Sequence, residues 1–165
     1  MKRLYFLFVA LAFSLFSIAQ TQGASKLYGY KQKQTPGTLR VDDNGNERPR
    51  APQFNYYIYL VSKSTVIPSE IWVDGQPYSA KASQQSTPVE YRHPNSAETK
   101  PQILVPKTSN RVLQLTTTQD KIEKPTTKGK NLASKNELVV IYKANNKWYY
   151  KAVSKMKELE PVMMQ

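Results

Sequence analysis

The chain of 165 residues has no cysteine and a single histidine, His93. Without cysteine it can form no disulfide, cysteine nucleophile or cysteine-linked lipid anchor, so core packing has to stabilise the fold. One histidine cannot supply the histidine pair of a zinc site. His93 precedes a proline in a segment rich in loop-forming residues. We therefore predict a surface loop histidine rather than a member of a catalytic triad.

Acidic residues are also few, with 12 Asp and Glu against 24 Lys and Arg. Glu70, Asp74 and Glu90 are the carboxylates nearest to expected strands, and no spacing pairs them as a glycosidase requires. Residues 42–47 carry three more carboxylates. A calcium-binding loop requires glycine at its sixth position, but here the glycine stands at the fourth, so we predict a turn. The chain is therefore predicted to be no enzyme and to hold no metal or cofactor.

Long hydrophobic runs are absent apart from residues 4–18, which follow Lys2 and Arg3. This run is shorter than the roughly twenty residues that a membrane-spanning helix needs. We predict that residues 1–19 are a secretory signal peptide and that the mature chain begins at Gln20. The protein is then exported, to the periplasm or the cell exterior, and the mature chain has no transmembrane segment.

The charge of the mature chain is strongly positive. Of the 24 basic residues, Lys2 and Arg3 belong to the predicted signal peptide, which leaves 22 against 12 acids and a net charge of +10. Such a charge favours anionic partners, which for an exported protein are acidic protein surfaces, anionic glycans or lipid head groups, and not nucleic acid. A basic surface is also typical of proteins that are charged only for solubility.

The rest of the chain consists of short β-type segments separated by turn residues. Residues 54–61 are the strongest strand, and because bulky side chains fall on both of its faces, it should be central in a sheet. Hairpin turns are predicted at residues 74–75 and 145–146. The second turn should set Tyr142 opposite Tyr149 and Ile141 opposite Tyr150, with Lys143 in a cation–π contact with Trp148. Further elements are expected at 89–92, 103–105 and 111–116 as strands, and at 154–160 as one helical turn.

About seven strands and no long helix predict an all-β fold, either an antiparallel β-sandwich of the immunoglobulin-like kind or a small barrel. Residues 20–53 are polar and interrupted by Gly and Pro. We interpret them as an N-terminal arm with an edge strand. Residues 54–165 are predicted to form one β domain, because the mature chain is too short for a second independent core.

Residues 119–136 are predicted to form a long basic loop. Its five lysines are the candidate contacts for an anionic partner: Lys121, Lys124, Lys128, Lys130 and Lys135. The alternative is a merely solvated loop, which we favour because no pattern directs these side chains to one surface.

Aromatic residues are plentiful in the expected strands. Nine of them could line a carbohydrate or peptide groove or else pack in the core: Tyr56, Tyr57, Tyr59, Trp72, Tyr78, Tyr91, Trp148, Tyr149 and Tyr150. Their alternation within strands favours the core. In particular, we expect Tyr57, Ile58 and Trp148 to have structural roles.

Five segments, together with the Ala19-Gln20 junction, resemble a group of short exported periplasmic proteins of Bacteroidota. The segments are 26–30, 56–59, 71–75, 104–108 and 159–162. The resemblance implies an accessory role in envelope machinery such as TonB-type energy-transducing systems. The predicted function is a non-enzymatic periplasmic interaction module, an accessory subunit of a cell-envelope complex, with sheet edges that could accept a partner strand. The alternative is a binding module for an anionic glycan or lipid surface.

Overall fold

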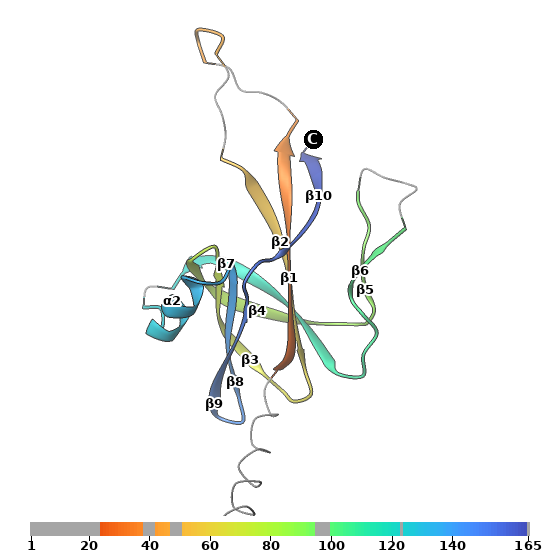
Figure 1. Ribbon diagram of the computed structural model, residues 1–165, viewed down its shortest axis with the longest axis vertical. Helices are drawn as coiled ribbons and strands as arrows, with labels where there is room; N and C mark the ends of the chain where they lie inside the picture. The colour runs from red at the N-terminus through yellow and green to blue at the C-terminus, as the bar shows by residue number, and fades with distance from the viewer. Residues whose placement is uncertain (1–23, 38–41, 47–50, 95–99, 123, 165) are drawn as a thin grey trace, which may run out of the picture.

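The computed structural model describes residues 24–37, 42–46, 51–94, 100–122 and 124–164 (Figure 1). The predicted signal peptide and the predicted mature start at Gln20 lie outside these residues. In chain order the elements are β1 (Ala24–Pro36), β2 (Gln53–Ser62), β3 (Ile67–Val73), β4 (Gln76–Gln85), β5 (Val89–Tyr91), β6 (Gln102–Val105), β7 (Arg111–Lys121), α2 (Thr127–Ala133), β8 (Leu138–Ala144), β9 (Lys147–Val153) and β10 (Lys157–Met164). No helix in the described part of the chain is long and apolar enough to cross a membrane.

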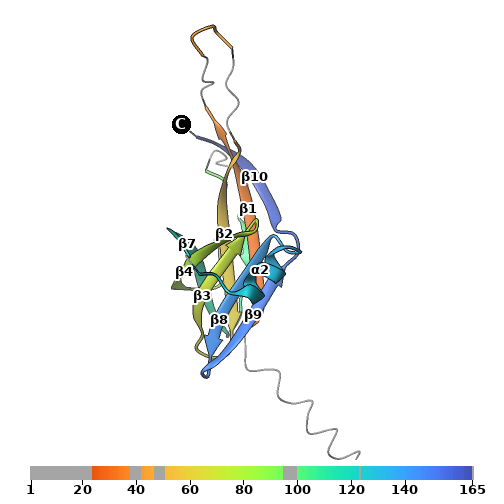
Figure 2. The same cartoon turned by 90° about the vertical axis from the view of Figure 1, so that its left-hand side faces the viewer.

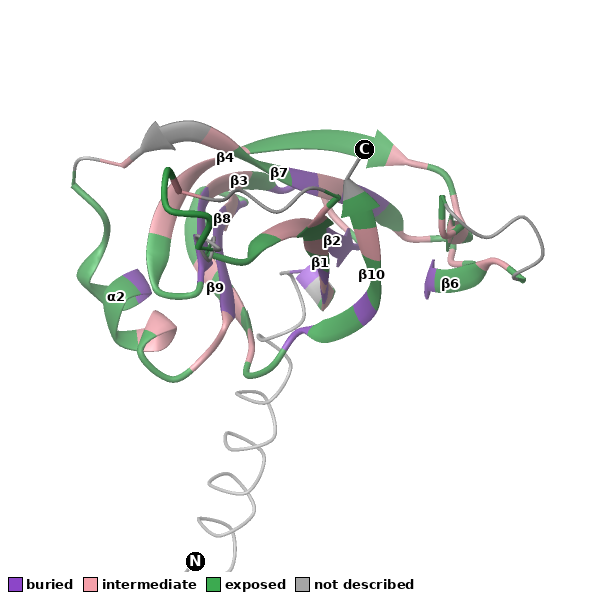
Figure 3. Cartoon of the chain, turned by 90° about the horizontal axis from the view of Figure 1, so that it is seen from above, coloured by how far each residue is buried: buried purple, intermediate pink, exposed green. Residues whose placement is uncertain are grey.

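Eight strands form one sheet in the order β10-β1-β2-β7-β4-β3-β8-β9, and β5 and β6 form a separate two-stranded sheet. Seen from above, the large sheet curls into a half-barrel (Figure 3). The all-β prediction is therefore confirmed, in a form closer to the predicted barrel than to two facing sheets. The sheet is not wholly antiparallel, because β1 and β10 run parallel.

The position of β2 confirms the prediction of a central strand, because β2 lies between β1 and β7. The predicted edge strand of the N-terminal arm was placed wrongly: β1 has β2 on one side and β10 on the other. The helical turn predicted at 154–160 is also wrong. β10 is extended there, with Leu159 buried and paired with Gln32, because pairing with β1 outweighs the local helical preference.

Both predicted hairpins are confirmed. Their turn residues have positive φ at both positions, as a two-residue turn of the I′ type requires: Asp74 at 47°, Gly75 at 79°, Asn145 at 47° and Asn146 at 60°. In the β8–β9 hairpin Ile141 pairs with Tyr150. Tyr142 stacks on Tyr149 with ring centroids 5.8 Å apart.

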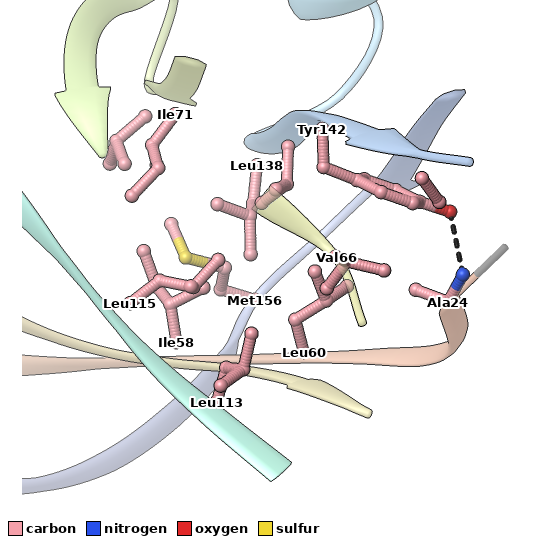
Figure 4. Close-up of a cluster of buried hydrophobic side chains, with 13 residues drawn as sticks. Ala24, Ile58, Leu60, Val66, Ile71, Leu113, Leu115, Leu138, Tyr142 and Met156 are labelled. Atoms are coloured by element: carbon pink, nitrogen blue, oxygen red, sulfur yellow. Dashed lines mark hydrogen bonds between the residues drawn. The ribbon is translucent and has the colours of Figure 1, made fainter. Parts of the chain in front are cut away.

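The main core fills the concave face of the sheet. It includes Ile58, Leu115 and Leu138, all at most 1% exposed, and Met156 from the segment between β9 and β10 (Figure 4). The Tyr142 hydroxyl accepts a hydrogen bond from the Ala24 backbone N–H at 2.9 Å, which joins β8 to the start of β1. The core and this hydrogen bond therefore link strands that lie far apart in the order of the sheet.

The outer, convex face has two separate covers. The β5–β6 sheet packs on β1, β2 and β7, where Leu104 and Val105 complete a second buried cluster. Helix α2 lies against β3 and β8 (Figure 2), where Leu132 and Ala133 pack on Trp72, Val139 and Ile141. The outer face of β9 lies beside α2, and this is where the candidate site is found.

A candidate binding groove between α2 and β9

The prediction of a long loop at 119–136 is wrong, because this segment contains the end of β7 and all of α2. Its lysines are therefore spread over several elements. Lys121 belongs to β7, and its side chain is outside the described residues; Lys124 precedes α2, Lys128 and Lys130 lie on it, and Lys135 follows it, all four exposed. Of these four, Lys128 is placed over an aromatic ring, and it borders the groove described below.

Helix α2 is positioned by a buried carboxylate. Glu70, 6% exposed, accepts hydrogen bonds from the Thr126 backbone N–H (3.3 Å), the Thr126 hydroxyl (3.1 Å) and the Trp72 indole N–H (2.9 Å). The Thr126 hydroxyl also caps the helix by accepting from the Gly129 N–H at 3.1 Å. The carboxylate thus ties the start of the helix to the strand beneath it.

A glycine lets α2 approach the sheet closely. Gly129 is buried directly against Trp72, and a Cβ at this position would lie 2.7 Å from Cε2 of the indole. No side chain larger than hydrogen fits without moving the helix or the ring. The height of α2 above β3 and β8 is therefore set by this contact.

Between α2 and the outer face of β8 and β9 lies a groove of about 290 Å³. Its lining consists of Thr126, Lys128, Ile141, Trp148, Tyr149 and Tyr150. Two of these side chains stand out in solvent, Trp148 at 62% and Tyr150 at 49% exposed. Because both lie on β9 at alternate positions, they project from the same face of the sheet.

The expected structural role of Trp148 is therefore wrong. Alternation in β9 turns Tyr149 inward onto Tyr142 and turns Trp148 outward, where it stays mostly in solvent while the apolar side of α2 packs on Trp72, Val139 and Ile141. The same expectation is confirmed for Ile58, which is 1% exposed, and for Tyr57, which is half-buried with its ring 5.6 Å from that of Tyr91.

The other aromatic candidates follow the predicted core role. Tyr59 and Trp72 are buried, and the remaining five tyrosines are partly buried against a core cluster: Tyr56, Tyr57, Tyr78, Tyr91 and Tyr149. Trp148 and Tyr150 are the exceptions. The alternating pattern was visible in the sequence, but the outward direction of these two rings was not.

The apolar surface continues beyond the groove across three strands. The register places Ile67 of β3 opposite Lys143 of β8, and Lys143 opposite Trp148 of β9. Residues paired in this way share one face of a sheet. Ile67 is 66% exposed. We call Ile67, Lys128, Lys143, Trp148 and Tyr150 together the aromatic–lysine patch.

The two lysines of the patch interact with its rings. Lys128 Nζ lies 4.7 Å from the ring centroid of Tyr150, and Lys143 Nζ lies 6.0 Å from that of Trp148, as predicted for the second pair. Within the described residues the ion pairs are those of Lys31, with Glu137 (3.3 Å) and Glu158 (3.5 Å). Among the described residues, no carboxylate forms an ion pair with Lys128 or Lys143.

Asp74, weighed for catalysis, and Asp42, weighed for calcium binding, have structural partners. The Asp74 carboxylate accepts a hydrogen bond from the Tyr56 hydroxyl at 2.9 Å, and burial together with this bond raises the pKa of Tyr56. Asp42 Oδ1 accepts from the backbone N–H groups of Asn44 and Asn46, confirming the predicted turn. These backbone hydrogen bonds, that from Asn46 foremost, lower the pKa of Asp42. Glu47 lies outside the described residues.

His93, predicted on the surface, is half-buried, with Nε2 2.9 Å from the carbonyl oxygen of Pro161. Its ring therefore contacts the backbone of β10 as well as solvent. Within the residues that the structure describes, no group of three His, Asp or Glu side chains is arranged to hold a metal ion.

Comparison of the chain with protein-family models, with curated proteins and with solved structures finds no significant match. Any function of this chain is therefore inferred from its sequence and from the geometry of the groove.

Proposed function

We propose that this protein is a non-enzymatic interaction module of the cell envelope that binds a partner protein through the groove between α2 and β9. The observation that carries the proposal is the pair of exposed rings, Trp148 and Tyr150, on one face of a regular strand. Trp and Tyr are the residue types enriched at the energetic centres of protein interfaces. A contiguous exposed apolar surface of this kind marks an interaction site more often than a chance feature.

The rigid setting of the rings supports this role. β9 is paired with β8 along its whole length without a register shift, and the two-residue turn ties the strands together. On the other side of the groove, Glu70 and Gly129 hold α2 in place. A surface that is already ordered loses little conformational entropy when a partner binds.

The face of the sheet suits binding better than its edges. At one end of the sheet, β10 contains Pro161, which has no N–H to donate, and its register with β1 shifts at this point. At the other end, β9 is in contact with β1 across the opening of the half-barrel. Both features oppose the addition of a partner strand, which was the binding mode expected from the sequence.

The location of the module is proposed from the sequence. Export rests on the signal-peptide pattern of residues 1–19, and an accessory role in an envelope complex, such as a TonB-type system, rests on the resemblance to periplasmic proteins of Bacteroidota. Net positive charge is consistent with a partner that is acidic.

A second candidate function is the binding of an anionic glycan or lipid surface. The observation that favours it is the placement of Lys128 and Lys143 beside the exposed rings. One fact weighs against sugar stacking on Tyr150: the Lys128 ammonium group already lies over that ring, 4.7 Å from its centroid. We therefore rank this candidate second.

The test is a crosslinking capture from native envelope with three forms of the protein: the unaltered chain, the double variant Trp148→Ala/Tyr150→Ala, and the control Ile103→Ala/Met163→Ala. Ile103 and Met163 are also exposed, at 57% and 69%, but lie on β6 and β10. We expect the unaltered chain and the control to capture the same protein and the groove variant to lose it. Equal capture by all three forms would refute the groove as the binding site.

The second candidate is tested in parallel with phosphatidylglycerol vesicles and with polygalacturonate. Binding of either one that is lost in the groove variant and weakened by salt would favour the anionic surface over a protein partner. Mass spectrometry of the exported protein tests the location. A mature mass that begins at Gln20 is expected, and one that retains residues 4–18 would contradict export by a cleaved signal peptide.

A further inference from the structure

The aromatic–lysine patch has a composition that restricts what can occupy it. Its exposed apolar groups, Ile67, Trp148 and Tyr150, alternate with Lys128 and Lys143. An occupant without charge would bury two ammonium groups and give them no counter-charge, at a cost in desolvation. An occupant with apolar groups alone is therefore a poor match for this surface.

The chain has no free carboxylate of its own in the described part of the patch. Glu70, the acidic residue beneath α2, is buried and accepts hydrogen bonds from Thr126 and Trp72. The described ion pairs involve Lys31 and are elsewhere. Because no carboxylate of the described residues pairs with Lys128 or Lys143, we assign their counter-charges to the partner.

The size of the groove limits the occupant as well. A volume of about 290 Å³ is at the lower end of the range of roughly 300 to 1,000 Å³ that is typical of small-molecule sites. Such a groove can take an anchoring side chain from a short segment. It cannot take a whole helix, which is about 10 Å across.

We propose that the occupant is a short acidic segment of the partner protein, a conclusion that rests on the proposed function of the groove. One large apolar or aromatic side chain of this segment lies over Ile141 and against Trp148 and Tyr150. Carboxylates on either side of this anchor pair with Lys128 and Lys143. The rings already hold both ammonium groups near the groove, so few lysine rotamers have to be ordered on binding.

A second copy of this chain does not fit the same description. A two-fold contact through the patch would bring Lys128 and Lys143 of one copy against the identical lysines of the other. The predicted mature chain carries a net charge of +10, so long-range repulsion acts in the same direction. Charge complementarity thus selects an acidic partner over self-association.

The first experiment is a selection from a random peptide library displayed on phage, with the full chain as bait and counter-selection against Trp148→Ala/Tyr150→Ala. We expect enriched peptides in which Asp or Glu flanks a large apolar or aromatic residue. Enriched peptides without an acidic bias, or no enrichment relative to the groove variant, would overturn the inference.

The second experiment measures the affinity of the most enriched peptide for charge variants. We expect Lys128→Gln/Lys143→Gln to weaken binding roughly three- to tenfold at low ionic strength, with a smaller loss at physiological salt. The matched control, Lys33→Gln/Lys107→Gln, removes the same charge from exposed positions on β1 and after β6 and should change affinity little. Equal losses in the two charge variants would overturn the pairing with Lys128 and Lys143.

The two proposals fail in different ways. If envelope capture depends on Trp148 and Tyr150 but peptides show no acidic preference, the groove remains the binding site and the acidic segment is wrong. If phosphatidylglycerol vesicles or polygalacturonate occupy the groove and peptides do not, the inference is likewise overturned. If envelope capture is unaffected by loss of both rings, the proposed function itself is refuted.

Discussion

The outer face of the half-barrel is covered at two places, by the β5–β6 sheet and by α2, and the two covers differ in how far they exclude water (Figure 3). Under β5–β6, Leu104 and Val105 are at most 2% exposed. Beside α2, Trp148 is 62% exposed although it lies in an equally regular strand. One cover closes its part of the sheet, and the other leaves a groove.

The placement of the covering elements explains the difference. Strands in a sheet are about 4.8 Å apart and a helix is about 10 Å across, so one helix covers about two strands. α2 accordingly packs on β3 and β8 and leaves much of the outer face of β9 exposed. Leu104 and Val105 of β6 instead pack directly on buried side chains of β1, β2 and β7.

Polar groups beneath the β5–β6 cover are also satisfied. The Gln32 side chain, 1% exposed, donates from Nε2 to the Glu160 carbonyl oxygen at 2.8 Å and to the Tyr91 hydroxyl, and it accepts from the Tyr57 hydroxyl at 3.1 Å. This network joins β1, β2, β5 and β10, and in the described part of the chain no buried side-chain nitrogen or oxygen lacks a hydrogen-bond partner. A closed cover stabilises the fold, whereas a partial cover can present a binding surface.

The largest effect is expected under the closed cover. Replacing Leu104 by Ala should destabilise the protein by about 2 to 5 kcal/mol, because the side chain is 2% exposed and its removal leaves a cavity. Urea denaturation measures the change in the free energy of unfolding. A change below about 0.5 kcal/mol, the size of an ordinary surface effect, would show that β5–β6 is not a closed cover.

A smaller effect is expected where α2 meets the sheet. Replacing Gly129 by Ala should cost about 1 to 3 kcal/mol, because the added methyl group overlaps Trp72. The displacement of α2 should also move Lys128 away from Tyr150 and weaken binding in the groove. Thermal melting reports the loss of stability, and tryptophan fluorescence reports the displacement of α2 from Trp72. An unchanged melt would contradict the close approach of the helix.

The next prediction concerns the carboxylate beneath α2. Replacing Glu70 by Gln should cost about 1 to 2 kcal/mol, because an amide cannot accept all the bonds that Thr126 and Trp72 donate. Hydrogen exchange at the Gly129 amide should become faster than in the unaltered protein. Equal exchange rates in the two proteins would show that Glu70 does not hold α2.

The smallest effect on stability is expected at the exposed ring. Replacing Trp148 by Ala should change the free energy of unfolding by no more than about 0.5 kcal/mol, because the side chain is mostly in solvent. Binding in the groove should nevertheless be lost. A destabilisation of about 2 kcal/mol or more would mean that Trp148 has a structural role and that both covers are closed.

Several features of the fold followed from local patterns. The turn at Asn145-Asn146 predicted the pairing of Lys143 with Trp148, and the bulky residues of 54–61 predicted a strand with neighbours on both sides. Turn chemistry and alternation act over a few residues, so they can be read without knowledge of the rest of the fold.

The candidate site was predicted only in part. Lys128 was among the proposed contacts and Trp148 among the candidate groove aromatics, but nothing in the sequence placed them beside each other. The helix that carries Lys128 is seven residues long, and its position depends on Glu70 and Trp72, which are more than fifty residues away in the chain. Contacts over such separations leave no local periodicity to recognise.

Three features could be read from residues alone: the all-β class, the two tight hairpins and the strongly basic charge each depend on composition or on neighbouring residues. Three others emerge only in the folded chain: β1 is an inner strand, residues 157–164 are extended, and much of the outer face of β9 is exposed. The physical reason is that strand order and the reach of α2 depend on non-local packing. The same Trp148 would be buried if the covering element were one strand wider.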